Sequence, residues 1–249
     1  MSEMIEQFDA LDWQNQPFDC AGCAFTALRE AGRCELKKAC VNDRYALRID
    51  RFFNWNPEAA KDCLTHPYFE VRAIAAKHVE VFYLPRLMRD PDETVRWSAA
   101  QRLPQRQLMQ MRDDPDREVR IRIAARLDPA DLRSMMDDAD YYVRTIVARR
   151  IPEGWLSQMM RDADREVRVE VARRIGPWQL QAMAADAESC VRLIAAERLA
   201  PEHLLALRGD DDCQVRHLVA QRIAPGQLGP LLEDEDEAVR QVALARRPH

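Results

Sequence analysis

Residues 116–127 read DREVRIRIAARL, and this stretch holds the pattern that decides the fold. Its apolar residues recur at helical spacing among strong helix formers, which predicts an amphipathic α-helix. Asp116 stands where an N-cap residue belongs, and Glu118 follows in the first turn, where a carboxylate interacts favourably with the helix dipole. Pro129 comes directly after the stretch and predicts the end of the helix.

The dipeptide Val-Arg of this stretch recurs at a constant interval of twenty-four, with its valines at Val71, Val95, Val119, Val143, Val167, Val191, Val215 and Val239. If each copy is numbered from the residue before the valine, position 7 is alanine and position 21 is aspartate in seven copies. A fixed period of this length indicates stacked supersecondary units. A second apolar piece in each copy, such as residues 130–136, has room for a 3₁₀ segment or a short α-helix. A leucine-rich repeat has the same length, but its strand of alternating leucines is missing here. The pattern predicts an all-α solenoid.

Position 3 is arginine in every copy: Arg72, Arg96, Arg120, Arg144, Arg168, Arg192, Arg216 and Arg240. At 100° per residue this position falls inside the apolar arc of the helix, so we expect these side chains to be at least partly buried. A buried cation must be paired, and the aspartate at position 21 is the obvious partner. We predict a ladder of Arg–Asp contacts, in which Arg120 reaches Asp114 of the preceding repeat or Asp138 of its own. A phosphate-binding stripe is the functional alternative.

A second arginine column occupies position 9, at the edge of the apolar arc. Its members are Arg102, Arg126, Arg150, Arg174, Arg198, Arg222 and Arg246. We expect this column to be exposed. It is therefore the better candidate for a partner-binding surface, with an ordinary solvated face as the alternative.

Residues 46–69 follow the same frame loosely, with Leu47-Arg48 in place of Val-Arg and HPYF (66–69) in place of DPDE. We interpret this segment as a degenerate capping repeat. The chain then divides into an N-terminal metal domain at 1–45, the capping repeat at 46–69, and eight repeats at 70–249, the last one truncated. Cys63 falls at position 18, where other copies carry leucine or methionine, which predicts a small core residue.

Four of the seven cysteines, Cys20, Cys23, Cys34 and Cys40, are clustered near the N-terminus at the spacing C-x2-C-x10-C-x5-C. Four thiolates suit either a tetrahedral Zn²⁺ ion or a [4Fe–4S] cluster, and the chemistry favours the cluster slightly. Disulfides are a third option, disfavoured in a reducing compartment. The cations expected to offset the thiolate charge are Arg33, Lys37 and Lys38, and the expected aromatic cover is Trp13, Phe18 and Phe25. Cys190 and Cys213 are expected to be ordinary thiols.

The CAGC motif, the two following cysteines and repeats of the form VRxxxAxRL together resemble the leucine-rich repeat variant family. The resemblance covers nearly the whole chain. It implies a right-handed superhelix of alternating α and 3₁₀ helices and an N-terminal [4Fe–4S] cluster. It also implies that Cys20, Cys23, Cys34 and Cys40 are the cluster ligands, with Cys63 as the one nearby competitor.

Composition narrows the classes of function. The net charge is −5, which argues against a general nucleic-acid or membrane binder, and no apolar run approaches the roughly 20 residues of a membrane span. The N-terminal MSEMIEQFDALDW lacks the apolar core of a signal peptide, so we expect a cytoplasmic protein. The histidines are scattered and no catalytic motif is present, so we expect no enzymatic activity.

These features together favour a non-catalytic scaffold for a protein partner not identifiable from sequence. Its cluster would sense redox state or oxygen, or would cap the open end of the solenoid. The alternatives are an electron-transfer protein that docks a redox partner, and a helical-repeat protein that binds or acts on nucleic acid.

Overall fold

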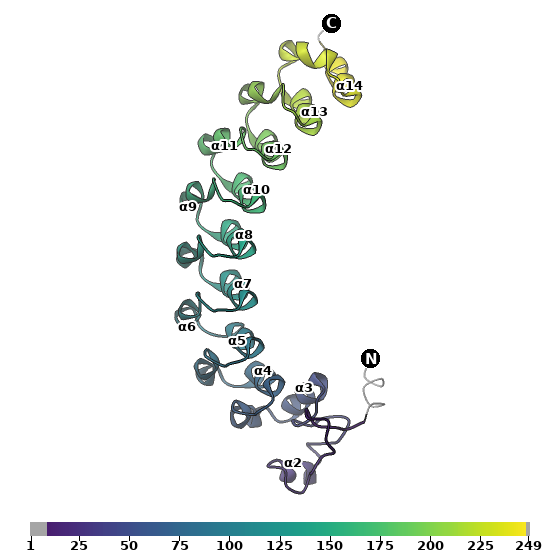
Figure 1. The fold of residues 1–249 in the computed structure, drawn as a ribbon, viewed down its shortest axis with the longest axis vertical. Coiled ribbons are helices and arrows are strands. Elements are labelled where there is room, and N and C mark those ends of the chain that lie inside the picture. Colours follow the sequence, from purple (N-terminus) through teal and green to yellow (C-terminus); the bar gives the residue numbers. More distant parts are fainter. Residues whose placement is uncertain (1–8, 248–249) are drawn as a thin grey trace. The chain divides into compact units, whose positions relative to one another are not determined.

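The computed structural model describes residues 9–247; from residue 46 onward these form helices joined by short turns, whereas residues 9–25 and 31–45, on either side of the short helix 26–30, are irregular (Figure 1). Within this range there is no β-strand, only isolated bridges such as Glu35 to Ala39. No helix in the described range is both long enough and apolar enough to cross a bilayer. Most of the segment that argued against a signal peptide, residues 1–8, lies outside the description, as does His249.

The chain divides into two compact units, one ending at Leu127 and one beginning at Asp128. In the first unit, α3 packs on α4, α4 on α5, and α5 on α7, so the longer helices of successive repeats are neighbours. Its elements are α2 (Thr26–Glu30), α3 (Ala46–Trp55), η1 (Pro57–Cys63), α4 (Phe69–His78), η2 (Val81–Leu87), α5 (Glu93–Ala100), α6 (Gln105–Gln110) and α7 (Arg117–Arg126), where η denotes a 3₁₀ helix.

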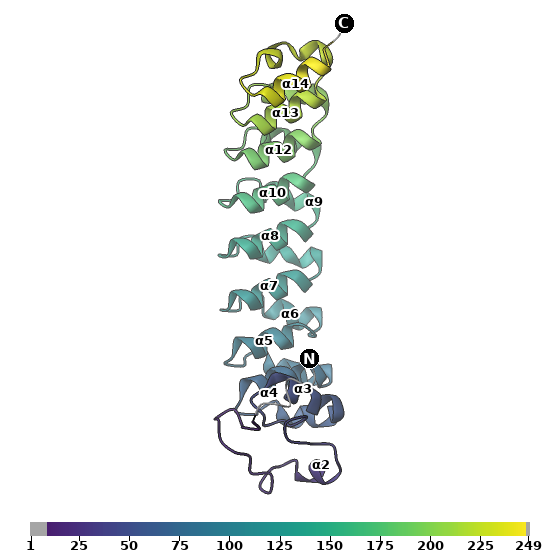
Figure 2. The same cartoon turned by 90° about the vertical axis from the view of Figure 1, so that its right-hand side faces the viewer.

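In the second unit α8 packs on α10, α10 on α12, α12 on α13, and α13 on α14 (Figure 2). Its elements are η3 (Pro129–Met135), α8 (Tyr141–Arg150), α9 (Glu153–Leu156), η4 (Ser157–Met159), α10 (Arg165–Arg174), α11 (Pro177–Met183), α12 (Ser189–Arg198), η5 (Pro201–Leu207), α13 (Cys213–Arg222), η6 (Pro225–Gln227), η7 (Gly229–Glu233) and α14 (Glu237–Ala245). The second piece of a repeat is 3₁₀ in some copies and α-helical in others, so both forms allowed by the sequence occur. The all-α repeat prediction is confirmed.

Each repeat buries the residues that define the period. The position 2 valines and the position 7 alanines are completely buried. The side chain of Asp116 accepts hydrogen bonds from the backbone N–H groups of Glu118 and Val119, so the predicted N-cap is confirmed. The same cap recurs at Asp92, Asp140, Asp164, Asp212 and Asp236. Glu188, at the start of α12, makes no side-chain capping bond.

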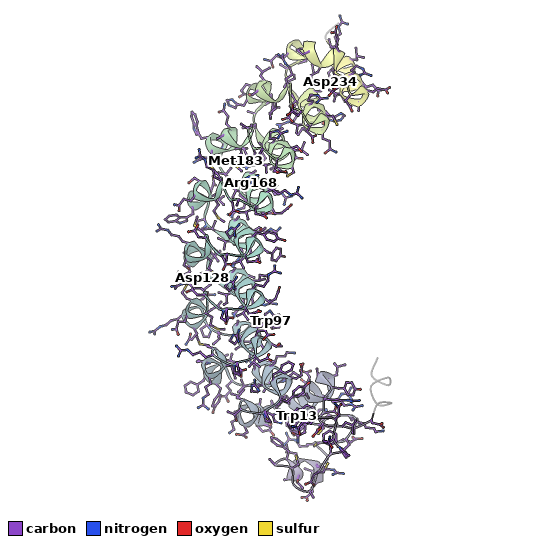
Figure 3. The ribbon with its side chains drawn as sticks, in the orientation of Figure 1. Trp13, Trp97, Asp128, Arg168, Met183 and Asp234 are labelled. Atoms are coloured by element: carbon purple, nitrogen blue, oxygen red, sulfur yellow. The ribbon has the colours of Figure 1, made fainter. Side chains whose placement is uncertain are left out.

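The predicted Arg–Asp ladder is present, and the partner aspartate comes from the same repeat. Arg168, on α10 (Figure 3), donates from Nε and Nη2 to the two carboxylate oxygens of Asp186, at 2.8 and 3.0 Å. Its Nη1 donates to the backbone carbonyl of Asp162 in the preceding repeat, at 2.8 Å. Each rung thus joins two repeats through charge-assisted bonds in a largely buried setting. The same bidentate pair forms at Arg72–Asp90, Arg96–Asp114, Arg144–Asp162, Arg192–Asp210 and Arg216–Asp234.

The second arginine column is also structural, and the prediction that it is exposed is wrong for every member but Arg198. Arg174 donates to the carbonyl oxygens of Ala148 and Ile151 at the C-terminal end of α8, at 2.6 and 2.8 Å. These carbonyls lack partners within their own helix, so a cation there is doubly favourable. Equivalent bonds to the preceding repeat are made by Arg102, Arg126, Arg198, Arg222 and Arg246. Half-buried guanidinium groups tied to backbone make a poor partner-binding surface.

Candidate metal centre

The two cysteines of CAGC are brought together by a tight turn. Asp19 accepts hydrogen bonds through one carboxylate oxygen from the N–H groups of Ala21 and Gly22, at 3.0 and 3.1 Å. The hydroxyl of Thr26, the first residue of α2, lies 2.7 Å from the carbonyl oxygens of both Cys20 and Cys23. This Asx-type turn therefore places both cysteines just before α2, where they line the same pocket.

The other two cysteines flank a second closed turn. Glu35 and Ala39 exchange two backbone hydrogen bonds of 2.8 Å, and Lys37 adopts a positive φ of 66° at the tip. This closure brings Cys34 and Cys40 to opposite ends of one small loop. The neighbouring Cys40 lowers the pKa of Cys34, whereas the neighbouring Cys34, together with burial, raises the pKa of Cys40.

All four predicted cysteines line a single pocket. They are free thiols, with Cys40 buried and the other three half-buried. The remaining lining residues are Phe18, Asp19, Phe25, Thr26, Arg29 and Asn42. Sequence spacing had suggested that the four sulfurs share a site, and the structure places them around the same cavity.

The surroundings of the pocket differ in part from the expectation. Arg33 is engaged with Glu58, and Lys38 with Glu35, so these cations have other partners. The cation that acts on Cys34 is Arg29, whose charge lowers the pKa of that thiol in addition to the effect of Cys40. It lies in α2, six residues after Cys23, so a cation on the helix that follows the CAGC motif could have been singled out from the sequence.

The aromatic cover is partly as expected. Phe18 and Phe25 line the four-cysteine pocket, and the ring of Phe25 meets that of Phe52 in α3 at 5.3 Å. Trp13 instead lines an adjacent cavity of about 590 Å³, where its ring packs edge-on against His66 at 4.8 Å. The two cavities share the wall that contains Cys23.

Two hydrogen-bond donors point at the sulfur of Cys23, and sequence reasoning had missed the side chain that supplies one of them. The backbone N–H of Phe25 and the side-chain amide of Asn42 each lie 3.4 Å from this sulfur. His66 lies 3.1 Å from the other end of the Asn42 amide, and burial lowers the pKa of His66.

The remaining cysteines have the environments predicted for them. Cys63 is buried, and burial raises the pKa of its thiol to about 12. It lines the adjacent cavity and not the four-cysteine pocket. Cys190 and Cys213 are exposed in the second unit. The prediction that Cys63 is a small core residue is confirmed.

The donor set is four cysteine thiols around one pocket, a ligand set that iron–sulfur clusters use and that zinc can also use. In a cluster each thiolate binds its own iron. N–H donors toward a sulfur also match the surroundings of such clusters.

Comparison with known proteins agrees with this geometry. Residues 10–62 match the family model described as "LRV protein FeS4 cluster". A solved structure, described as a leucine-rich repeat variant with a novel repetitive protein structural motif, is 42% identical in sequence with a TM-score of 0.85. The match covers 92% of this chain and 98% of that one.

A second relative is an uncharacterized 27.7 kDa protein from Rhodobacter capsulatus, described by its place in the nifB 3′ region. It is 52% identical over 101 residues, and this match spans only 41% of either protein. The solved relative, by contrast, is matched over almost its entire length. The chain therefore belongs to the leucine-rich repeat variant family, and its N-terminal segment is the part that implies an iron–sulfur cluster.

Proposed function

We propose that this chain is a non-catalytic scaffold for a protein partner and that it carries a redox-responsive [4Fe–4S] cluster bound by Cys20, Cys23, Cys34 and Cys40. The observation that carries the proposal is that these four free thiols line one pocket. The family match over residues 10–62 supports an iron–sulfur cluster in this segment. When bound, such a cluster supplies a one-electron redox centre.

The exposure of the pocket supports a sensing role. Cys20, Cys23 and Cys34 are only half-buried, and the adjacent cavity of about 590 Å³ reaches Cys23 from a second direction. A small oxidant such as dioxygen therefore has a path to the ligand sulfurs. The contact of Phe25 with Phe52 links the pocket wall to α3, so a change at the pocket reaches the first helix of the repeat stack.

Exposed aromatic side chains support the scaffold role. Phe82 in η2 and Trp178 in α11 occupy the same repeat position and are 81% and 88% exposed. The repeated arginines are consumed by contacts within the stack, so these rings are better candidates for contacting a partner. A binding assay that compares the parent with Trp178→Ser tests this part. We expect a partner protein that binds the parent not to bind the variant. Equal retention by both would contradict it.

The cofactor is tested first, by an anaerobic absorption spectrum with iron, acid-labile sulfide and zinc assayed on the same sample. We expect broad absorption near roughly 400 nm and about four iron and four sulfide per chain. Cys34→Ser should lose most of this iron, whereas the matched control Cys190→Ser should retain it. A colourless protein with one zinc would overturn the redox proposal.

A second experiment separates sensing from capping. The purified protein is exposed to air while absorption near roughly 400 nm and the helical circular dichroism signal are followed together. Sensing predicts that the cluster absorption falls while the helical signal is retained. If the helical signal collapses with the absorption, the cluster is a structural cap instead.

A further inference from the structure

The aspartate at position 21 of a regular repeat makes three kinds of contact, as Asp90 illustrates. One carboxylate oxygen accepts from the N–H of Asp92 at 2.9 Å. Its backbone carbonyl accepts from Arg96 of the next repeat at 2.9 Å. Its carboxylate pairs with Arg72 of its own repeat, at 2.7 and 2.8 Å.

His66 occupies this position in the capping repeat, one full period before Asp90, and it keeps two of the three contacts. Its Nδ1 accepts from the backbone N–H of Tyr68 at 3.1 Å, as the carboxylate does elsewhere. Its backbone carbonyl accepts from Arg72 of the next repeat at 2.8 Å. His66 therefore makes the same contacts with the residues that follow it, Tyr68 and Arg72, as a regular aspartate makes with its own following residues.

The third contact is different. Arg48, the position 3 arginine of the same repeat, pairs at 3.0 Å with Asp43, and both side chains are completely buried. The ring of His66 lines the adjacent cavity instead, where its Nε2 lies 3.1 Å from the side-chain oxygen of Asn42, a residue that lines both cavities. The histidine at this ladder position thus contacts Asn42, where a regular aspartate contacts an arginine.

Hydrogen-bond chemistry determines which group donates at each step from Tyr68 through His66 and Asn42. The backbone N–H of Tyr68 only donates, so Nδ1 of His66 carries no proton. In the neutral ring the proton is then on Nε2, which donates to the oxygen of Asn42. With its oxygen held there, the amide of Asn42 presents its NH₂ group to the sulfur of Cys23, 3.4 Å away. The bond from His66 and the bond to Cys23 therefore require the same orientation of the Asn42 amide.

We infer that His66 and Asn42 are positioning residues that hold an amide N–H donor against Cys23 and so couple the cluster pocket to the first regular repeat. This inference rests on the proposed function, because its effect is exerted on a bound cluster. An N–H donor to a ligand sulfur stabilises the negative charge of the centre, most of all in the reduced state. The pair therefore raises the reduction potential and slows loss of the cluster.

The test measures the reduction potential and the retention of iron under a chelator in the full, cluster-loaded chain. Asn42→Ala removes the donor without adding charge, and His66→Ala releases the amide that it orients. We expect both variants to have a more negative potential and to lose roughly 10- to 100-fold in cluster retention. His66→Gln, which keeps a donor near the position of Nε2, should restore most of both properties.

The matched control is Asn54→Ala, which removes an amide of α3 that bonds only to Asp50 at 3.0 Å. It should leave the potential and the retention unchanged. A readout independent of the cluster is the ¹⁵N spectrum of the His66 ring, in which we expect a protonated Nε2 and an unprotonated Nδ1. The opposite tautomer would overturn the inference even if the alanine variants fail to fold.

The outcomes separate the two proposals. If the parent chain contains no iron and sulfide, the proposed function itself fails. If the parent carries the cluster but Asn42→Ala and His66→Ala match its potential and retention, the proposed function stands and this inference is wrong.

Discussion

The first rung of the ladder and the regular rungs use the same repeat positions for different purposes. Arg168 reaches forward along the chain to Asp186, and the two side chains remain 13% and 9% exposed. Arg48 reaches back to Asp43, just before α3, and both side chains are 0% exposed. A regular rung joins neighbouring repeats, whereas the first rung anchors the loop that carries the cysteines. Because Arg48 already has Asp43 as its partner, position 21 of this repeat does not need an aspartate, and His66 at that position contacts Asn42 instead.

Acidification acts on several regular rungs at once, those whose aspartate has a lowered pKa, and is expected to have the largest effect. The hydrogen bonds of Arg216 hold the pKa of Asp234 below its ordinary value. Burial alone would raise the pKa of Asp186, but the bonds from Arg168 and from the backbone N–H of Glu188, together with the charges of Arg168 and Arg192, lower it overall. A carboxyl group whose pKa is lower in the folded state stabilises the fold above its ordinary pKa of about 3.9, and this contribution is lost as the pH falls through the folded-state pKa.

We therefore expect the free energy of unfolding in urea to fall most steeply below about pH 4. The measurement is a urea titration followed by tryptophan fluorescence at a series of pH values. Equal stability at pH 3 and pH 6 would show that the ladder carboxylates contribute nothing measurable to the free energy of unfolding.

Breaking the first rung is expected to be the most damaging single substitution. Asp43→Ala leaves the fully buried guanidinium of Arg48 without its carboxylate, which costs about 3–5 kcal/mol. Thermal or urea unfolding of the full chain measures this loss. The control is Asp113→Ala, which removes an 81% exposed partner of Arg112 and should change stability by less than about 1 kcal/mol. A mild effect at Asp43 would mean that the first rung is no stronger than a surface pair.

A regular rung should cost somewhat less to break and should be replaceable by apolar residues. Asp186→Leu leaves Arg168 without its carboxylate in a site that is partly accessible to solvent. We therefore expect the free energy of unfolding to fall by about 3 kcal/mol, the lower end of the range for a broken buried ion pair. The double variant Arg168→Met with Asp186→Leu should recover at least half of that loss. If the double variant is as unstable as the single one, the rung contributes more than the cost of an unpaired charge.

The helix caps give the smallest effect and contain their own control. Asp164→Ala removes the side-chain acceptor for the N–H of Glu166 at the start of α10, which should cost about 1 kcal/mol. Glu188→Ala, at the equivalent position of α12, removes no capping bond and should change stability by less than about 0.5 kcal/mol. Urea unfolding of both variants compares them directly, and an equal loss at the two positions would contradict the capping role of Asp164.

Much of the repeat fold was predictable because it follows from local chemistry repeated at a fixed interval. The Val-Arg period, the caps and the Arg–Asp ladder all follow from helical geometry and from the cost of a buried charge. The exposure of the position 9 arginines was predicted wrongly, because the angle of this position on its own helix does not show which groups of the neighbouring repeat lie beside it. The carbonyl oxygens that Arg174 reaches belong to Ala148 and Ile151, in the preceding repeat, so only stacking brings them within range.

The sequence by itself determined the repeat length, the helical class, the ladder and the group of four cysteines, because each depends on residue types at fixed separations along one chain. Only the tertiary structure decided that Arg48 pairs with Asp43, and that His66 reaches Asn42 and through it Cys23. Asn42 and His66 lie a full repeat length apart in the chain and belong to no common motif. Their contact exists because the cysteine loop folds back onto the first repeat, and hydrogen bonds between side chains depend on proximity in space.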